Sequence, residues 1–261
     1  MSKSRQFVES LSRGFRLLSI VCNSRYSLSL SELAKESGLS ISTIQRLSYT
    51  LLQMDLLDRN PKTKRFRVGP KMVSLGLAVM NDLEIKKTAR PYMQEASDRI
   101  GEVVGLGVLS GAQIIFTEII RTDQILNINM NPGAIIPPHA TASGKAIMAY
   151  IPEAEMEAIL NKTELTPFTE NTITSIEGYK EHLKEVRRLG YAIAIEENAH
   201  GFSAIAAPIR DNNGKVFASI TIMVPSFRIS REKLIDSFRK EAIDTADRIS
   251  YAMGYPKNSL K

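Results

Sequence analysis

The sequence contains little of what several classes of protein require. It has a single cysteine, Cys22, which excludes a disulfide framework and a metal site made of cysteines alone. So few thiols are typical of a protein from a reducing compartment. The first ten residues, MSKSRQFVES, lack the hydrophobic core of a signal peptide, and no apolar run approaches the ~20 residues that a membrane span needs. We therefore expect a cytoplasmic protein that has no membrane partner.

Side chains that commonly perform catalysis or bind metals are few, and their spacing is unfavourable. The three histidines show no metal-ligand spacing among themselves or with Cys22. Glu196 and Glu197 would point to opposite faces of a strand, so they are poorly placed to act together. Ser143-Gly144-Lys145 resembles a phosphate-binding loop only superficially, because His139 stands where that motif needs a glycine. We predict no catalytic residue, no metal and no cofactor.

The positive charge of the chain is concentrated towards its N-terminal end. At 261 residues, 43% of them apolar, the chain is long enough for two ordinary globular domains. Its net charge is +6, yet residues 1–75 contain 13 Lys and Arg against 5 Asp and Glu, and the remainder is slightly acidic. A basic domain beside a nearly neutral one indicates binding to a polyanion, with nucleic acid as the leading candidate. A merely solvated basic surface is the alternative.

The N-terminal region is predicted to form three short helices. Apolar residues recur at helical spacing over 7–22, and Ser29 with Glu32 has the pattern of a capping box that begins a second helix. This helix ends at Gly38, and a third helix follows over 40–55. Ala34, Gly38 and Ile44 then supply the small residue, the turn glycine and the apolar plug that a helix-turn-helix needs.

A basic hairpin is predicted after the third helix. Strand-like runs over 56–59 and 65–68 flank the Asn60-Pro61 turn, which indicates a winged helix-turn-helix domain over residues 1–71. The third helix would enter the major groove of double-stranded DNA, where Gln45 could bond adenine and Arg46 guanine, or either could hold a phosphate. The hairpin cations would contact phosphates. The predicted DNA-binding residues are Ser31, Ser40, Ser42, Thr43, Gln45, Arg46, Tyr49, Arg59, Lys62, Lys64 and Arg65.

The rest of the chain is predicted to form a linker helix over 72–87 and an α+β domain over 88–261. Hairpins interrupted by helices are typical of an antiparallel sheet that helices cover. The expected strands span 102–109, 113–120, 124–130, 191–197, 203–211 and 214–224. The first expected helix of this domain begins at about residue 88, and the others span 142–150, 153–160, 175–189 and 230–253.

The segment PPHATASGKAIMAY places a loop before a helix whose first turn holds Thr141, Ser143 and Gly144. Free N–H groups at a helix start attract anions, so a ligand carboxylate could lie there. The alternative is that Thr141 or Ser143 only caps the helix, and the spacing by itself favours the cap.

Several segments carry recognisable motifs in a fixed order. They are GLSISTIQRLSYTL in the N-terminal region, then HATASGKAIMAY, GYAIAIEENAHGFSAIAAPIRDNNGKV and FASITIMVPSFRIS. Together they resemble the recognition helix and the three effector-domain signatures of the IclR family of bacterial transcriptional regulators, over about residues 8–253. The resemblance implies a GAF-like effector-binding domain, and a homodimer or dimer of dimers on a palindromic promoter operator. RNA polymerase is a possible further partner of such a regulator.

The resemblance also implies an effector pocket against the start of the helix at Thr141. In many members an aspartate, a cysteine and two hydroxyls complete that pocket. Here Ala194 stands at the aspartate position, Ala204 at the cysteine position and Met223 at one hydroxyl position. The expected effector-binding residues are Met130, Thr141, Ala142, Ser143, Gly144, Ala194, Ala204, Thr221 and Met223.

These replacements favour a larger and less polar effector than glyoxylate-like acids, such as an aromatic acid from a catabolic pathway. Alternatively, the alanines are ordinary strand packing and the ligand is bound elsewhere. The expected function is that of a DNA-binding transcriptional regulator controlled by a small metabolite, and not that of an enzyme. Two alternatives stay open: an enzyme whose catalytic α+β domain is tethered to a winged helix, and a ligand-blind DNA-binding protein.

Overall fold

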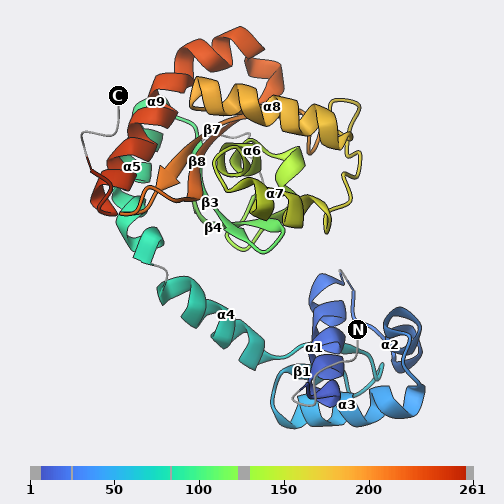
Figure 1. Cartoon of the computed structure of the whole chain (residues 1–261). Coiled ribbons are helices and arrows are strands. Elements are labelled where there is room, and N and C mark those ends of the chain that lie inside the picture. The colour runs from blue at the N-terminus through green and yellow to red at the C-terminus, as the bar shows by residue number, and fades with distance from the viewer. Residues whose placement is uncertain (1–6, 25, 83, 123–129, 257–261) are drawn as a thin grey trace. The chain divides into compact units, whose positions relative to one another are not determined.

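The computed structural model describes residues 7–24, 26–82, 84–122 and 130–256, with only the backbone of residues 77–82 (Figure 1). The chain divides into two compact units, residues 1–82 and 83–261. The N-terminal unit has one hydrophobic core and the C-terminal unit has two. None of the described helices is long and apolar enough to cross a membrane.

In the N-terminal unit, three helices pack around one core, and a two-stranded hairpin completes it. Its interior contains side chains from every one of these elements, among them Leu17, Leu33, Ile44 and Phe66. A fourth helix follows the hairpin. The elements are α1 (Glu9–Asn23), α2 (Leu30–Ser37), α3 (Ile41–Gln53), β1 (Leu57–Arg59), β2 (Phe66–Val68) and α4 (Pro70–Asp82).

Local signals in the sequence set the geometry of the helix-turn-helix. The Ser29 hydroxyl accepts a hydrogen bond from the Glu32 N–H, and the Glu32 carboxylate accepts one from the Ser29 N–H, so the capping box is confirmed. Gly38 ends α2 in the left-handed conformation with φ +68°, which a residue with a side chain rarely adopts. Ile44 is fully buried where α3 crosses the core. The predicted winged helix-turn-helix is therefore the observed fold.

Two expectations for the helices need correction. The apolar spacing over 7–22 does produce a helix, but Leu11 and Phe15 are 60% and 62% exposed, because only the second half of α1 packs on the core. The single linker helix expected over 72–87 is wrong in its bounds. α4 begins two residues earlier, at Pro70, whose fixed φ suits a first helical position, and it ends at Asp82, whereas Glu84 begins the next helix.

The C-terminal unit is a six-stranded antiparallel sheet with helices on both faces (Figure 1). The strand order is β5-β4-β3-β8-β7-β6, with α5 and α9 on one face and α6, α7 and α8 on the other. The elements are α5 (Glu84–Ile100), β3 (Val103–Ser110), β4 (Gln113–Ile120), β5 (Ile135–Ile136), η1 (Pro138–Ala140), α6 (Ala142–Met148), α7 (Glu153–Leu160), α8 (Ile176–Leu189), β6 (Ala192–Ile195), β7 (Phe202–Arg210), β8 (Val216–Pro225), η2 (Ser226–Arg228) and α9 (Arg231–Ala252).

This architecture agrees with the predicted α+β domain. Because helices cover both faces, the central strand β8 is buried along almost its whole length instead of alternating. The short edge strand β5 was not predicted, since two residues carry no periodic signal. The strand expected over 124–130 lies, except for Met130, outside the described residues, and Met130 itself is not in a strand.

Candidate functional site

The helix α3 and its N-cap residue contain six of the eleven residues expected to contact DNA. Its buried face is made by Ile44, Ser48 and Leu51, which leaves the opposite face open. Ser40 is the N-cap: its hydroxyl accepts a hydrogen bond from the Thr43 N–H at 3.3 Å and shares hydrogen bonds with the Ser42 and Thr43 hydroxyls. Thr43 is half-buried, whereas the exposed expected residues on or beside this helix are Ser40, Ser42, Gln45, Arg46 and Tyr49, with Ser31 exposed on α2.

The hairpin separates its cations into two groups. Lys62 and Lys64 are exposed at the turn and form no ion pair within the described residues. Arg65 instead donates to the Glu32 carboxylate at 2.8 Å and to the Ser27 carbonyl at 2.8 Å. Its guanidinium is therefore engaged in joining the hairpin to α2, which makes Arg65 a weaker candidate for a DNA contact than Lys62 or Lys64.

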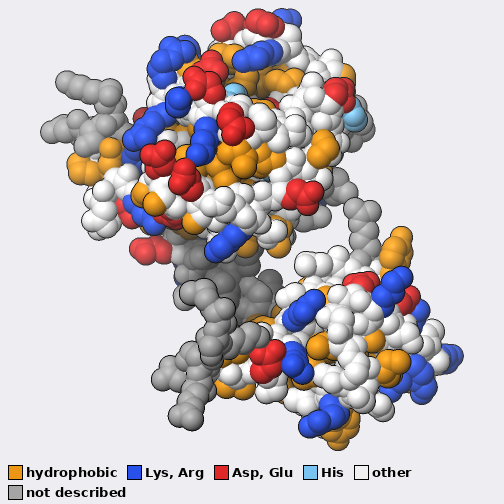
Figure 2. Space-filling view, turned by 45° about the vertical axis from the view of Figure 1, so that its right-hand side comes forward, with side chains coloured by type: hydrophobic (Ala, Val, Ile, Leu, Met, Phe, Trp, Pro, Cys, Tyr) orange, Lys and Arg blue, Asp and Glu red, His pale blue; other side chains and the backbone are white. Residues whose placement is uncertain are grey.

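Arg59 occupies an intermediate position. Its guanidinium lies 5.3 Å from the centre of the Phe66 ring, and its Nε donates to the Lys64 carbonyl at 3.2 Å. Its side chain is nevertheless exposed, so a face of the guanidinium can still meet a phosphate. Figure 2 shows Lys and Arg side chains prominent on the visible face of the N-terminal unit, whereas on the C-terminal unit they are interspersed with Asp and Glu.

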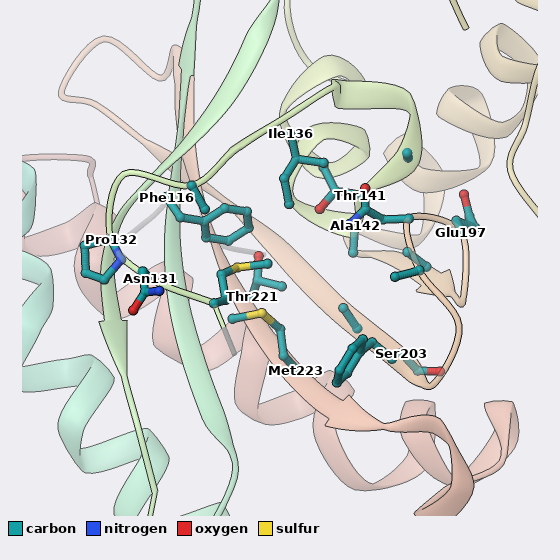
Figure 3. Close-up of a pocket in the computed structure, with 18 of the residues that line it drawn as sticks. Phe116, Asn131, Pro132, Ile136, Thr141, Ala142, Glu197, Ser203, Thr221 and Met223 are labelled. Carbon is teal, nitrogen blue, oxygen red and sulfur yellow. The ribbon is translucent and has the colours of Figure 1, made fainter. Parts of the chain in front are cut away.

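A cavity of about 580 Å³ lies in the C-terminal unit, on the face of the sheet that carries α6. Its walls come from β4, β5, β6, β7, β8, the start of α6 and the turn after β6. Figure 3 shows Phe116, Ile136, Thr221 and Met223 around this space, with Thr141 and Ala142 at its upper edge. Seven of the expected effector-binding residues line it: Met130, Thr141, Ala142, Ala194, Ala204, Thr221 and Met223.

The other two expected residues, Ser143 and Gly144, lie outside the cavity lining and are removed from the candidate site. The Ser143 hydroxyl shares a 2.7 Å hydrogen bond with Ser219 between α6 and β8. Gly144 lies so close to the backbone of Pro138 that an added Cβ would be 2.3 Å from the Pro138 carbonyl oxygen. The favoured capping role is also wrong, because Thr141 occupies the N-cap position without a side-chain capping bond.

The cavity is mostly apolar, with one unsatisfied hydroxyl. Thr221 Oγ1 is buried and has no hydrogen-bond partner among the described residues. Thr221 lies opposite Gly105 on β3 and Ala206 on β7, and the side chains of Met223 and Phe116 cover Gly105. A buried hydroxyl without a partner costs free energy, and a polar group of a ligand would recover it.

Sequence reasoning missed a buried ion pair behind the cavity wall. Lys145 Nζ lies 2.5 Å from the Oε1 atom of Glu197, a residue that also lines the cavity. Burial lowers the pKa of Lys145 and raises that of Glu197, and their mutual attraction opposes both shifts. Burial, with the Lys145 charge adding to it, lowers the pKa of His182 on α8 to about 4. His139 is buried, and its Nε2 is 3.1 Å from the Thr166 carbonyl oxygen.

These side chains form no evident catalytic or metal centre. Within the described parts of the chain, no three His, Cys, Asp or Glu side chains group in a way that could hold a metal ion. Lys145 and Glu197 neutralise each other. The arrangement is therefore that of a mostly apolar binding cavity in one unit and, in the basic unit, a groove-sized helix with an open polar face.

Two family models match the chain. The bacterial transcriptional regulator IclR C-terminal domain matches residues 77–251, and the IclR helix-turn-helix domain matches residues 10–61. The chain belongs to the IclR family. It is therefore a DNA-binding transcriptional regulator with an effector-binding domain, and the alternative of a tethered enzyme is wrong.

Relatives of known identity extend over nearly the whole chain. The HTH-type transcriptional regulator XynR of Escherichia coli K12 is 30% identical and aligns over 95% of this chain and 98% of its own. An IclR family regulator from Brucella abortus superposes with a TM-score of 0.83 at 25% identity, covering 97% of this chain and 95% of that one. An IclR homologue from Microbacterium hydrocarbonoxydans, solved in complex with 4-hydroxybenzoate, shares the fold with a TM-score of 0.73 at 23% identity, over 93% and 100%.

Proposed function

We propose that the 580 Å³ cavity is the effector site of this IclR-family regulator and that it takes an aromatic acid or a similarly compact apolar acid. The volume lies within the ~300–1,000 Å³ of typical small-molecule sites. Phe116, Ile136 and Met223 offer it apolar surface, and the alanines at 194 and 204 leave space where bulkier polar side chains would narrow it. This composition fits a ring better than a two- or three-carbon acid.

The polar end of such a ligand would meet the two threonines. Thr221 supplies a buried hydroxyl without a partner, and the Thr141 hydroxyl is not used as a helix cap. A protein of the same fold has been solved in complex with 4-hydroxybenzoate, which supports an aromatic acid as a ligand. For this chain the assignment depends on the cavity itself, and the unpartnered Thr221 hydroxyl is the observation that carries it.

Thermal-shift titration of the full chain tests the effector class. We expect benzoate and 4-hydroxybenzoate to raise the melting temperature more than glyoxylate or pyruvate at equal concentration. Thr221→Val should weaken binding of the aromatic acid by about tenfold, the effect of one lost hydrogen bond. Thr163→Val, whose hydroxyl lies outside the cavity, serves as the control. Stabilisation by the two small acids alone would contradict the proposal.

We infer that α3 inspects the base edges of a promoter operator while Lys62 and Lys64 neutralise phosphates. Arg46 is exposed on the open face of α3 and has no ion-pair partner among the described residues. If Arg46 reads a base, Arg46→Ala lowers operator affinity by about 1–3 kcal/mol and relaxes specificity at one position. Gel-shift titration measures the affinity of wild type and variant for the operator and for a scrambled duplex. If the wild type binds both duplexes equally, α3 does not read the operator sequence.

A homodimer on a palindromic operator fits the exposed apolar residues of α1. Leu11 and Phe15 are one helical turn apart and largely exposed, so together they form an apolar patch on the surface of α1. Contiguous apolar patches often mark a protein–protein interface. A second copy of the chain would cover them, and two such dimers would make a tetramer. Light scattering tests this: Leu11→Glu with Phe15→Glu should lower the oligomeric state, whereas Arg13→Glu on the same helix should not.

Control by the effector would be a two-state coupling between the units. The ligand shifts operator affinity only by its differential affinity for the two states, and DNA must change ligand affinity by the same factor. A contact with RNA polymerase would belong to an activator and not to a simple repressor. Operator affinity that is identical with and without a bound effector would favour the ligand-blind alternative.

A further inference from the structure

A second cavity, of about 330 Å³, lies in the C-terminal unit, and no residue lines both cavities. It is formed where five segments meet: the residue after α6, the end of α8, the end of β7, the middle of α9 and the turn after α9. Its floor is apolar, with Ala207, Pro208, Ile243 and Ala246. Two charged side chains, Arg210 and Asp247, line the same space.

Arg210 lines this space next to an irregularity in the sheet. The register between β7 and β8 shifts between Ile209 and Arg210, which is the position of a β-bulge. Bulges re-aim a side chain relative to the regular pleat, and they are common beside functional sites. The extra residue is Phe217 on β8, and the Arg210 N–H donates to the Ser250 hydroxyl at 2.9 Å, which ties the end of β7 to α9.

Two tyrosine rings hold the Arg210 guanidinium. Its central carbon lies 4.7 Å from the centre of the Tyr150 ring and 5.8 Å from that of Tyr255. Tyr150 is itself anchored, because its hydroxyl donates to the Arg187 carbonyl at 3.2 Å. Tyr255 is positioned by a left-handed turn at Gly254, with φ +91°, after which its N–H donates to the Ser250 carbonyl. A guanidinium stacked on rings keeps its N–H edge available for a planar anion.

Neither charge in the cavity is paired within the described residues. No carboxylate oxygen there lies within 4.0 Å of the Arg210 guanidinium, and Asp247 forms no hydrogen bond or ion pair. Asp247 is half-buried on α9, and burial raises the pKa of its carboxyl while the Arg210 charge lowers it. Two half-buried opposite charges normally close into a pair or find a partner, because an unpaired charge loses hydration without compensation.

We propose that this second cavity binds a small zwitterion, whose carboxylate meets Arg210 and whose ammonium group meets Asp247. Free α-amino acids are the common molecules of this chemistry. A bidentate guanidinium–carboxylate pair gives orientation, and the apolar floor accepts a modest aliphatic side chain. The volume, at the lower end of the range for small-molecule sites, suits a ligand of that size. The ligand is distinct from the effector of the first cavity.

A thermal-shift screen of the full chain with the twenty standard L-amino acids comes first, followed by isothermal titration of the tightest binder. We expect that amino acid to bind at least about tenfold more tightly than its deaminated acid and its decarboxylated amine. Asp247→Asn should weaken binding of the amino acid by about tenfold, because its ammonium group loses the carboxylate partner. Binding of the deaminated acid, which has no ammonium group, should be unchanged. Arg210→Gln should weaken both.

Matched variants keep the result interpretable. Asp236→Asn and Arg239→Gln change exposed residues of α9 outside the cavity and should bind as the wild type does. Thr221→Val in the first cavity should also leave amino-acid binding unchanged, which separates this proposal from that of the effector site. The proposal is overturned if no amino acid binds, or if the deaminated acid or inorganic phosphate binds as tightly as the amino acid. It is also overturned if both Asp247→Asn and Arg210→Gln bind the amino acid as tightly as the wild type does.

Discussion

The Nζ atom of Lys145 lies 2.5 Å from Oε1 of Glu197, although the two residues are 52 positions apart in the sequence. The Lys145 side chain has no exposed surface and that of Glu197 is 11% exposed. The pair joins α6 to the turn after β6, and both of these segments line the 580 Å³ cavity. Thr172 holds the same turn by donating to the Glu197 carbonyl at 2.6 Å. The wall of the cavity is thus held by a charge pair of which Glu197 is itself a lining residue.

Removing one partner of this pair should be costly. Lys145→Met leaves the Glu197 carboxylate buried without its counter-ion, so we expect the free energy of unfolding to fall by about 3–5 kcal/mol. Lys184→Met removes an exposed pair in which both side chains are 75% exposed, and should change stability by less than about 1 kcal/mol. Urea unfolding followed by circular dichroism measures both. A Lys145→Met variant as stable as wild type would show that the pair adds nothing.

Replacing Lys64 and replacing Arg65, two adjacent cations of the hairpin, should change different properties: DNA binding in the first case and stability in the second. Lys64→Met removes one phosphate contact, so the slope of log affinity against log salt should fall by about 1 with stability unchanged. Arg65→Met should instead lower the stability of the N-terminal unit by about 1 kcal/mol, because Arg65 holds Glu32 and Ser27. Salt-dependent anisotropy titration and thermal unfolding separate the two effects. An unchanged salt slope for Lys64→Met would refute its role.

Adjacent residues with such different roles show where sequence reasoning ends. The capping box of Ser29 and the turn at Gly38 were predictable, because each depends on residues three or four positions away. Lys64 and Arg65 look alike in sequence, and only the distant Glu32 decides which of them is engaged. Likewise Ser143 looked like a ligand or a cap, but its partner Ser219 lies 76 positions away on β8.

The cavity shows the same limit. Thr221 and Met223 were placed correctly because alternate strand residues share a face, and the family resemblance indicated which face. Glu197 was set aside because adjacent strand residues diverge. In the structure the strand β6 ends at Ile195, and Glu196 takes a positive φ of +53°, so the backbone turns and Glu197 faces inward. Periodicity cannot report a change of backbone conformation at a single residue.

Acidification should destabilise the C-terminal unit partly through His182. Burial, assisted by the Lys145 charge, lowers the pKa of His182 from 6.5 to about 4. Between these values the unfolded chain carries a proton that the folded chain lacks, so stability falls as the pH falls through this window. The wild type should therefore lose free energy of unfolding between pH 7.5 and pH 5, and in His182→Gln this loss should be smaller by about 2 kcal/mol.

Denaturant unfolding at the two pH values checks the His182 prediction. Lys184→Met, which changes an exposed residue on the same helix, is the control and should keep the wild-type dependence on pH. If His182→Gln loses as much stability as the wild type on acidification, the histidine does not titrate in the way that its burial implies.

Replacing Gly144 by alanine tests whether this glycine serves packing, as the structure indicates, or contacts a ligand. An added Cβ would lie 2.3 Å from the Pro138 carbonyl oxygen and 2.4 Å from the Pro138 Cα, and backbone atoms cannot rotate away as a flexible side chain can. Gly144→Ala should therefore push η1 away from α6 and lower the free energy of unfolding by at least the ~1–3 kcal/mol of an overpacked core.

Gly76→Ala is the control, because its Cβ would meet nothing within 4 Å inside α4 and alanine favours a helix by about 0.5–1 kcal/mol. Thermal unfolding of both variants, with the effector titration repeated at a temperature where each is folded, distinguishes the two roles. Loss of effector affinity in a Gly144→Ala protein of unchanged stability would return the glycine to the binding site.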